Sequence, residues 1–146
     1  MKRFHVNVSV SDLARSITFY SRLFAAPPAV VKSDYAKWML DDPRVNFAVS
    51  TRAAGAGIDH VGIQAEDELE FADLRQRLTE ADTLILHQND TVCCYARSTK
   101  SWVHDPDGVA WETFLTRGDA TEYGDGTLVT DHRPDAPGLD SSASTR

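Results

Sequence analysis

The sequence predicts an α+β fold in which one βαβββ unit is used twice along the chain. The first observation is an internal repeat, because FHVNVSV (4–10) aligns with DHVGIQA (59–65) and places His5 on His60. The second observation is that strand-like and helix-like periodicities follow each of these segments in the same order. Since a sequence repeat is the signature of a duplicated structural unit, the two copies are expected to share one architecture.

The first copy begins with a strand and a helix. Apolar residues alternate with polar ones over residues 4–10, which is the period of a β-strand. Ser11 and Asp12 are good N-cap residues, and apolar residues then recur at helical spacing from Leu13 to Phe24, before two prolines. Three short apolar runs complete this copy near residues 29–32, 36–40 and 45–50, with DDPR (41–44) as a turn.

The second copy repeats this order, with a strand at 59–65 and a helix at 67–81 that carries Phe71, Leu74, Leu78 and Ala81 on one face. Its last strands are expected near residues 83–87, near 92–95 or 101–104, and at 109–115. Matching Trp38 with Trp102 requires a longer offset than matching the two histidines, so the second copy holds about nine extra residues. This insertion lies between the helix and the last strands, within the segment HQNDTVCCYARSTK (87–100).

Length and composition predict one domain followed by a tail. At 146 residues the chain can bury a hydrophobic core without the help of disulfides. We expect a single domain at 1–117, with module one at 1–52 and module two at 57–117. Residues 118–146 are rich in Gly, Asp, Ser, Thr and Pro and cannot bury enough apolar surface to offset their ordering entropy. They are therefore expected to form a flexible acidic tail.

Charge and cysteine content narrow the class of protein and its compartment. The net charge of -7 argues against a nucleic acid or an anionic membrane surface as a partner. No apolar run reaches the length of a membrane span, and the N-terminus lacks the apolar core of a signal peptide. Cys93 and Cys94 are too few for the disulfide framework of a secreted domain, and neighbouring cysteines close a strained ring. We expect a cytoplasmic protein with two free thiols.

Three residues are candidate metal ligands. His5 and His60 occupy equivalent places on the polar faces of the two first strands, and Glu112 lies on an otherwise apolar strand face. A carboxylate there should become neutral unless a cation pairs with it. The counterpart of Glu112 in the first copy is Ala48, so three of four equivalent positions hold donors. A single strand histidine is more often hydrogen-bonded packing. Two imidazoles and one carboxylate, however, form the ligand set of non-haem Fe(II) oxygenases and suit catalytic Zn²⁺.

The repeat, these ligands and five further motifs resemble a known family. The duplicated βαβββ pattern is similar to the vicinal oxygen chelate superfamily, which includes glyoxalases, fosfomycin-resistance proteins and extradiol dioxygenases. At motif level the chain resembles the aerobic organoarsenical carbon–arsenic lyases and the cadmium-induced proteins of the same group. The motifs are FHVNVSVSDLARSITFYSRLF, DYAKWMLDDPRVNFAVS, GIDHVGIQ, CCYARSTKSWVHDPDGVAWETF and TRGD, within about residues 2–119. This resemblance implies two modules that form a cup-shaped, barrel-like sheet around a metal site.

The resemblance also implies an activity and assigns its residues. It implies an Fe(II)- and O₂-dependent lyase that converts trivalent methyl- or aryl-arsenicals to arsenite. By the same resemblance, His5, His60 and Glu112 hold the iron and act in catalysis through it, while Cys93 and Cys94 bind the arsenical. Nickel, cobalt or zinc can occupy such a site on purification, and both a monomer and a homodimer are compatible with the fold. The tail has no cysteine, so it offers no third thiol.

The two thiols suit trivalent arsenic, since soft ligands select soft centres. Neighbouring side chains of a strand point to opposite faces, so we expect Cys93 and Cys94 in a turn or loop where both reach one atom. Arg97 and Lys100 are near in sequence and would favour the thiolate forms. From the residues alone, it is an equal alternative that Cys93 and Cys94 are two small buried hydrophobic side chains and bind no soft metal.

Two other functions stay open at this stage. The chain could bind cadmium or arsenic as a resistance protein without turnover, in which case the three donors need not hold iron. It could also be a glyoxalase-like metalloenzyme on another divalent metal. The alanine at position 48 argues mildly against the four-ligand versions of that chemistry.

Overall fold

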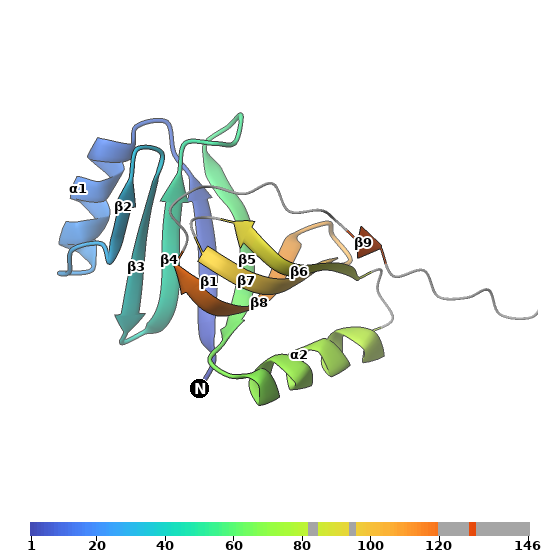
Figure 1. The fold of residues 1–146 in the computed structure, drawn as a ribbon. Coiled ribbons are helices and arrows are strands. Elements are labelled where there is room, and N and C mark those ends of the chain that lie inside the picture. Colours follow the sequence, from blue (N-terminus) through green and yellow to red (C-terminus); the bar gives the residue numbers. More distant parts are fainter. Residues whose placement is uncertain (82–84, 94–95, 120–128, 131–146) are drawn as a thin grey trace, which may run out of the picture.

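The computed structural model describes residues 1–81, 85–93, 96–119 and 129–130, with 86–93, 96–97, 117–119 and 129–130 described by their backbone alone. The first half contains β1 (Arg3–Ser9), α1 (Leu13–Leu23), β2 (Val30–Lys32), β3 (Tyr35–Asp41) and β4 (Arg44–Ser50). The second half contains β5 (Gly57–Ala65), α2 (Glu68–Glu80), β6 (Leu86–Cys93), β7 (Ala96–His104) and β8 (Ala110–Asp119). The predicted βαβββ order is therefore confirmed in both halves (Figure 1).

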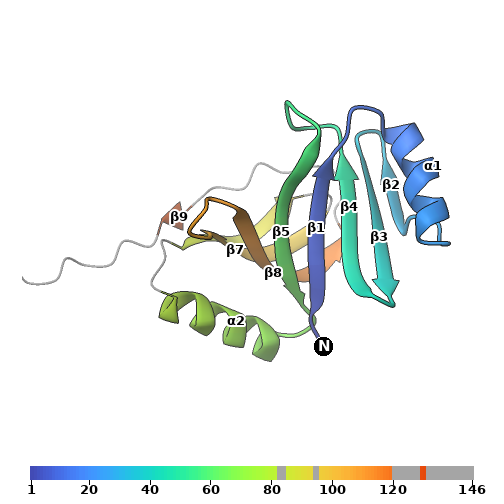
Figure 2. The ribbon, with the colours of Figure 1, turned by 180° about the vertical axis from the view of Figure 1, so that it is seen from behind.

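All strands belong to one open mixed sheet, in the order β2-β3-β4-β1-β5-β8-β7-β6-β9. The first strands of the two halves, β1 and β5, lie antiparallel at its centre, and each also pairs in parallel with the last strand of its own half. Strands β1 to β5 stand nearly upright while β6 to β8 cross them at a steep angle, so the sheet is strongly curved (Figures 1 and 2). The α+β class with a cup-like sheet is confirmed.

Helix α1 covers the first half of the sheet on its outer face. Asp12 caps the helix by accepting a hydrogen bond from the backbone nitrogen of Arg15 at 2.9 Å. The helix ends at Leu23, before the two prolines that were expected to stop it. Its apolar stripe packs on fully buried Trp38, whose ring lies 6.0 Å from the ring of Phe24. This aromatic core fixes the helix to β3 and β4.

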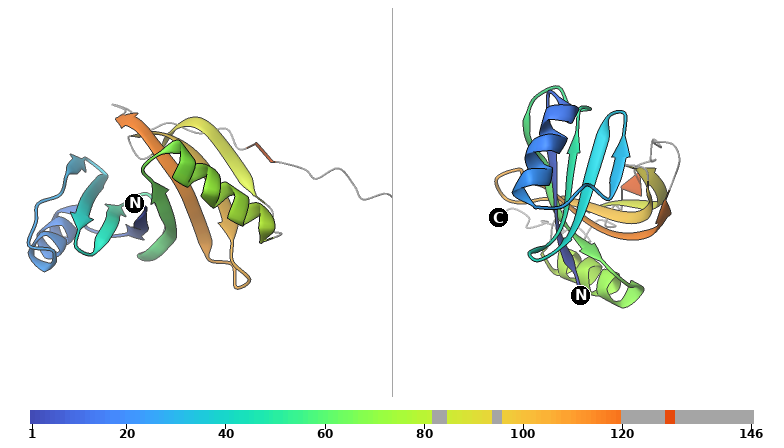
Figure 3. Two further views of the ribbon diagram at one scale, coloured as in Figure 1. Left: turned by 90° about the horizontal axis from the view of Figure 1, so that it is seen from below. Right: turned by 90° about the vertical axis from the view of Figure 1, so that its left-hand side faces the viewer.

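Helix α2 covers the second half in the same way, so each helix lies against its own part of the sheet (Figure 3). Asp67 caps it by accepting from the backbone nitrogen of Glu70 at 2.8 Å. Phe71 and Leu74 are buried against the sheet, as their spacing predicts. Further along the predicted face, Ala81 is exposed, because the packed contact ends earlier than the periodicity does.

The inner face of the sheet carries polar side chains instead of helices. Along β1, Val8 packs into the core beneath α1, whereas His5, Asn7 and Ser9 point to the other face and are buried there. The same alternation on β5 separates outward Ile63 from inward residues. The candidate ligands are therefore placed in the concavity, on the side away from both helices.

The insertion of the second copy differs from the expected loop. It lengthens two paired strands, β6 and β7, whose register runs from Leu86–Trp102 to Cys93–Ala96. Cys93 is thus the last residue of β6, and Cys94 lies outside the described residues. The turn or loop predicted for the pair is therefore not found at Cys93, which still pairs with Ala96 of β7.

The C-terminal segment contributes more to the sheet than composition suggested. β8 continues to Asp119, and β9 (Val129–Thr130) pairs antiparallel with Leu86 and His87 of β6. The rest of the segment expected to be a tail lies outside the described residues. Within the described part of the chain, no helix has the length and apolar character needed to cross a membrane.

Candidate metal site

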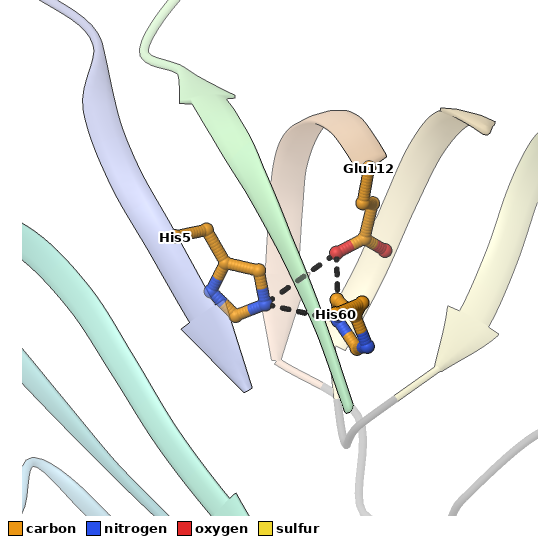
Figure 4. Close-up of side chains that lie close together, drawn as sticks. All are labelled: His5, His60 and Glu112. Atoms are coloured by element: carbon orange, nitrogen blue, oxygen red, sulfur yellow. Dashed lines mark hydrogen bonds and ion pairs between the residues drawn. The ribbon is translucent and has the colours of Figure 1, made fainter. Parts of the chain in front are cut away.

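His5, His60 and Glu112 come together from β1, β5 and β8, as the repeat predicts (Figure 4). The Nε2 atoms of the two histidines are 3.2 Å apart, and each lies 3.5 Å from Oε2 of Glu112. All three side chains are buried. Three atoms from three strands therefore form a nearly equilateral triangle in the concavity of the sheet.

Both histidine rings are fixed by a contact of the Nδ1 atom, on the side of the ring away from the triangle. His5 Nδ1 lies 3.0 Å from the backbone oxygen of Asn46, and His60 Nδ1 lies 2.7 Å from Oδ2 of Asp59. A carbonyl and a carboxylate can only accept, so both Nδ1 atoms must donate. Each Nε2 is thereby left to face the triangle. Partners of this kind orient the histidine ligands of metal sites and fix their tautomer.

Glu112 is held by a buried cation. Oε1 of Glu112 pairs with Nζ of Lys100 on β7, while Oε2 faces the two histidines. The Lys100 ammonium also lies over the rings of Phe114 and Trp102, with 5.4 Å and 5.9 Å to the ring centroids. The sequence placed Lys100 beside the thiols. The structure instead places it on the carboxylate, where it supplies the cation that a buried Glu112 requires.

Charges in the triangle follow from burial and these contacts. Burial lowers the pKa of His5 to about 4, so this ring is neutral. Burial opposes the charge of His60 too, but hydrogen bonds and charges of Glu112 and Asp59 raise its pKa above the ordinary value. Burial would raise the pKa of Glu112, but Lys100 first, and then the two histidines, hold it well below its usual range. The site therefore combines a neutral His5, an ionised Glu112 and a His60 ring whose protonated form is favoured by its two acidic neighbours.

The geometry fits a divalent metal ion. Ligand atoms about 2.1 Å from one ion and adjacent to one another lie about 3.0–3.5 Å apart. The three measured separations, 3.2 Å, 3.5 Å and 3.5 Å, are in this range, so all three donors fit one face of a coordination sphere. A cation here would compete with a proton for Nε2 of His60. The remaining carboxylate oxygen already has its partner in Lys100, which leaves a single oxygen for the metal.

One glycine makes room for the glutamate. Gly62 on β5 pairs with Glu112 on β8, and a Cβ atom at position 62 would lie 2.2 Å from the backbone oxygen of Glu112. Such a contact cannot exist, so the two strands can approach in this register only with glycine. Gly62 thus positions Glu112 through the backbone of the neighbouring strand.

Sequence reasoning found the three donors but missed the residues that orient them. Asp59 was available from the Asp-His dipeptide, and Gly62 from its place two residues after His60. Lys100 and Asn46 could be found only from the sheet register, because they lie on strands far from the histidines in sequence. Of the two cysteines predicted to bind substrate, Cys93 is described by its backbone alone and Cys94 lies outside the described residues.

The fold and site together define the class of protein. Residues 2–113 match the Glyoxalase/Bleomycin resistance protein/Dioxygenase superfamily, and the chain belongs to this superfamily, which is also called the vicinal oxygen chelate superfamily. The match includes both histidines and the glutamate. Family membership and the buried donor set together support an enzyme with a divalent metal site.

Within this superfamily, the chain is similar to organoarsenical cleaving enzymes and cadmium-induced proteins. The trivalent organoarsenical cleaving enzyme of Bacillus sp. (strain MD1) is 44% identical over 120 residues, which are 80% of this chain and 74% of the relative. The enzyme of the same name from Thermomonospora curvata is 37% identical over 82% of this chain and 81% of the relative. The cadmium-induced protein CadI of Mycobacterium tuberculosis is 34% identical over 90% of this chain and 87% of the relative.

Solved structures show the same fold at low sequence identity. A Mn(II)-bound glyoxalase from Novosphingobium aromaticivorans has a TM-score of 0.58 and 17% identity, covering 82% of this chain and 42% of that chain. An extradiol ring-cleaving dioxygenase from B. fuscum has a TM-score of 0.59 and 15% identity, covering 86% of this chain and 32% of that chain. These likenesses establish architecture alone.

Proposed function

We propose that the chain is an Fe(II)- and O₂-dependent lyase that cleaves the carbon–arsenic bond of trivalent methyl- or aryl-arsenicals, as part of organoarsenical detoxification. The observation that carries this proposal is a buried triangle of two histidines and one carboxylate in a chain 44% identical to a trivalent organoarsenical cleaving enzyme. Two imidazoles and a carboxylate on one face of a metal form the donor set of non-haem Fe(II) oxygenases. Nickel, cobalt or zinc can occupy the same donors on purification.

The reaction balances with O₂ as the oxidant. Methylarsonous acid, CH₃As(OH)₂, and O₂ together contain the atoms of formaldehyde and arsenous acid, As(OH)₃. The methyl carbon loses the electrons that O₂ gains, and arsenic remains trivalent. Iron, when bound, supplies open coordination positions and the electron that activates O₂ beside the substrate.

The residues of the chain divide the remaining work. His5, His60 and Glu112 hold the metal, and Lys100 keeps one carboxylate oxygen away from it. Cys93 and Cys94 hold the arsenic through the two bonds that trivalent arsenic can exchange, leaving the carbon–arsenic bond intact. We further propose a cytoplasmic protein, a monomer or homodimer, with one domain built on residues 1–117 and an acidic C-terminal segment that adds the end of β8 and β9 to its sheet.

Substitution of the thiols tests this division. Cys93→Ala and Cys94→Ala should each abolish arsenite production while Fe(II) binding keeps its affinity and one-to-one stoichiometry. Loss of iron in these variants would instead make the cysteines metal ligands and overturn the assignment. Cys93→Ala with turnover retained would show that capture of arsenic needs no thiol pair.

A second function is favoured by one observation, the 34% identity to the cadmium-induced proteins. In that case the chain would sequester Cd²⁺ or arsenic through its thiols without turnover. Stoichiometric uptake of the metal or metalloid with no organic product would establish it. A glyoxalase-like metalloenzyme would differ from both by an activity that needs glutathione and does not depend on oxygen.

A further inference from the structure

Asn7 lies on β1 beside the metal-site triangle, and its side chain carries an unsatisfied oxygen. It is 4% exposed, lies on the same face as His5, and is paired in register with His60 on β5. Among the residues that the structure describes, no donor reaches its Oδ1 atom. A buried amide oxygen without a partner destabilises a fold, so such an atom beside a polar site indicates a bound ligand.

The repeat explains why an amide fits at this place. Asn7 pairs with Ala48 across β1 and β4. The equivalent parallel pair in the second half is Gly62 with Glu112, across β5 and β8. In the second half β8 carries the long polar side chain of Glu112, and β5 has only glycine at the paired position. In the first half the sizes are reversed, because β4 has only the methyl group of Ala48 and β1 carries the amide of Asn7.

The exchange leaves each half with one oxygen-bearing side chain in this pair of positions, Glu112 in one half and Asn7 in the other. Glu112 cannot share its level with a side chain at position 62, since a Cβ there would meet the Glu112 backbone oxygen at 2.2 Å. Ala48 is fully buried and offers no donor. The register therefore places one oxygen-bearing side chain at the level of each histidine, Glu112 at the level of His5 and Asn7 at the level of His60.

We propose that Oδ1 of Asn7 is a fourth protein donor to a divalent cation held by the triangle, in place of the side chain that Ala48 lacks. This inference rests on the proposed metal site, but not on the arsenical reaction. Amide oxygen is a ligand that divalent cations such as Mn²⁺ accept beside imidazole and carboxylate. It is neutral, so the bound dication keeps a net positive charge against its single carboxylate. Two of six coordination positions then remain for small molecules.

Co(II) binding to the metal-free protein tests the inference without any arsenical. The full chain and its variants Asn7→Ala, Asn7→Asp and Asn7→Leu are titrated with Co(II), and affinity and visible absorption bands are recorded. Ser9→Ala is the matched control, because Ser9 is equally buried on the same face of β1 but pairs with Gly57, away from the histidines. Thermal unfolding of each metal-free variant is measured in parallel.

Loss of the amide should weaken Co(II) binding about tenfold to hundredfold in Asn7→Ala and Asn7→Leu, with shifted absorption bands. Asn7→Asp should restore or exceed the parent affinity, and Ser9→Ala should match the parent. Metal-free Asn7→Leu should unfold at or above the parent temperature, because leucine removes an unsatisfied oxygen. Unchanged affinity and bands in both Asn7→Ala and Asn7→Leu would overturn the inference. Absence of Co(II) binding in the parent chain would instead refute the metal site itself.

Discussion

Lys100→Met is the substitution with the largest stability effect that the site geometry predicts. In the metal-free protein the Lys100 ammonium pairs with Oε1 of Glu112, and the side chains are only 5% and 2% exposed. Removing one partner of a buried ion pair leaves the other charge without compensation, at a cost of about 3–5 kcal/mol. For a chain of this length each kcal/mol corresponds to about 2–4 °C, so the melting temperature should fall by about 6–20 °C.

The stability lost in Lys100→Met should depend on pH. The pKa of Glu112 is held below its usual range, so its charged form stabilises the fold above the ordinary carboxyl pKa, and this is lost as pH falls through the lowered pKa. Without Lys100, burial raises the folded pKa, and a protonated Glu112 no longer needs a cation. The deficit of Lys100→Met should therefore be largest near neutral pH and shrink as the pH is lowered.

Urea unfolding in the presence of a chelator measures the effect, with Lys2→Met as control. Lys2 pairs with Asp73 at 3.4 Å on an exposed surface and should contribute no more than about 1 kcal/mol. Addition of a divalent cation should narrow the deficit, because the cation pairs with the same carboxylate. A loss below about 1 kcal/mol for Lys100→Met, or a deficit that grows at low pH, would refute the role assigned to the ion pair.

Three further predictions test the site and the core. Gly62→Ala should lower the free energy of unfolding by about 1–3 kcal/mol and weaken divalent-metal binding, because the added methyl group meets the backbone of Glu112. Gly55→Ala is the control, since there is open space around Gly55, and it should bind metal normally. Metal affinity should fall as the pH is lowered through the raised pKa of His60, because a proton and the cation compete for its Nε2 atom, as followed by titration at several pH values; pH-independent affinity would contradict it. Trp38→Phe should lose about 1 kcal/mol in chemical unfolding, because its Nε1 donates to a backbone carbonyl at 3.1 Å; an unchanged midpoint would show that this bond is replaced by water.

Much of the fold followed from periodicity, because the duplicated strand and helix patterns are local. The alternation around His5 predicted β1 and its inner face, and Asp12 predicted the start of α1. The long β6 and β7 strands could not be predicted in the same way. Their polar sequence around Cys93 lacks alternation, and these strands are stabilised by pairing with each other and with their neighbours β8 and β9.

The site was predictable as donors but not as an electrostatic unit. The repeat alone aligned His5 with His60 and opposed Glu112 to Ala48. The cation that keeps Glu112 charged lies on the neighbouring strand, and a sequence cannot show which lysine is directed inward until the register of β7 against β8 is known. Lys100 was therefore associated with the nearby thiols, although the structure pairs it with the carboxylate.

The most direct test of the proposed function is arsenic speciation after trivalent methylarsenic is mixed with anaerobically prepared protein. Four mixtures are compared, with and without Fe(II) and with and without O₂. Arsenite and formaldehyde in equal amounts, formed only when both iron and oxygen are present, are the predicted result. Methylarsenic that remains intact and bound one to one in all four mixtures would contradict the lyase and make the chain a binding protein.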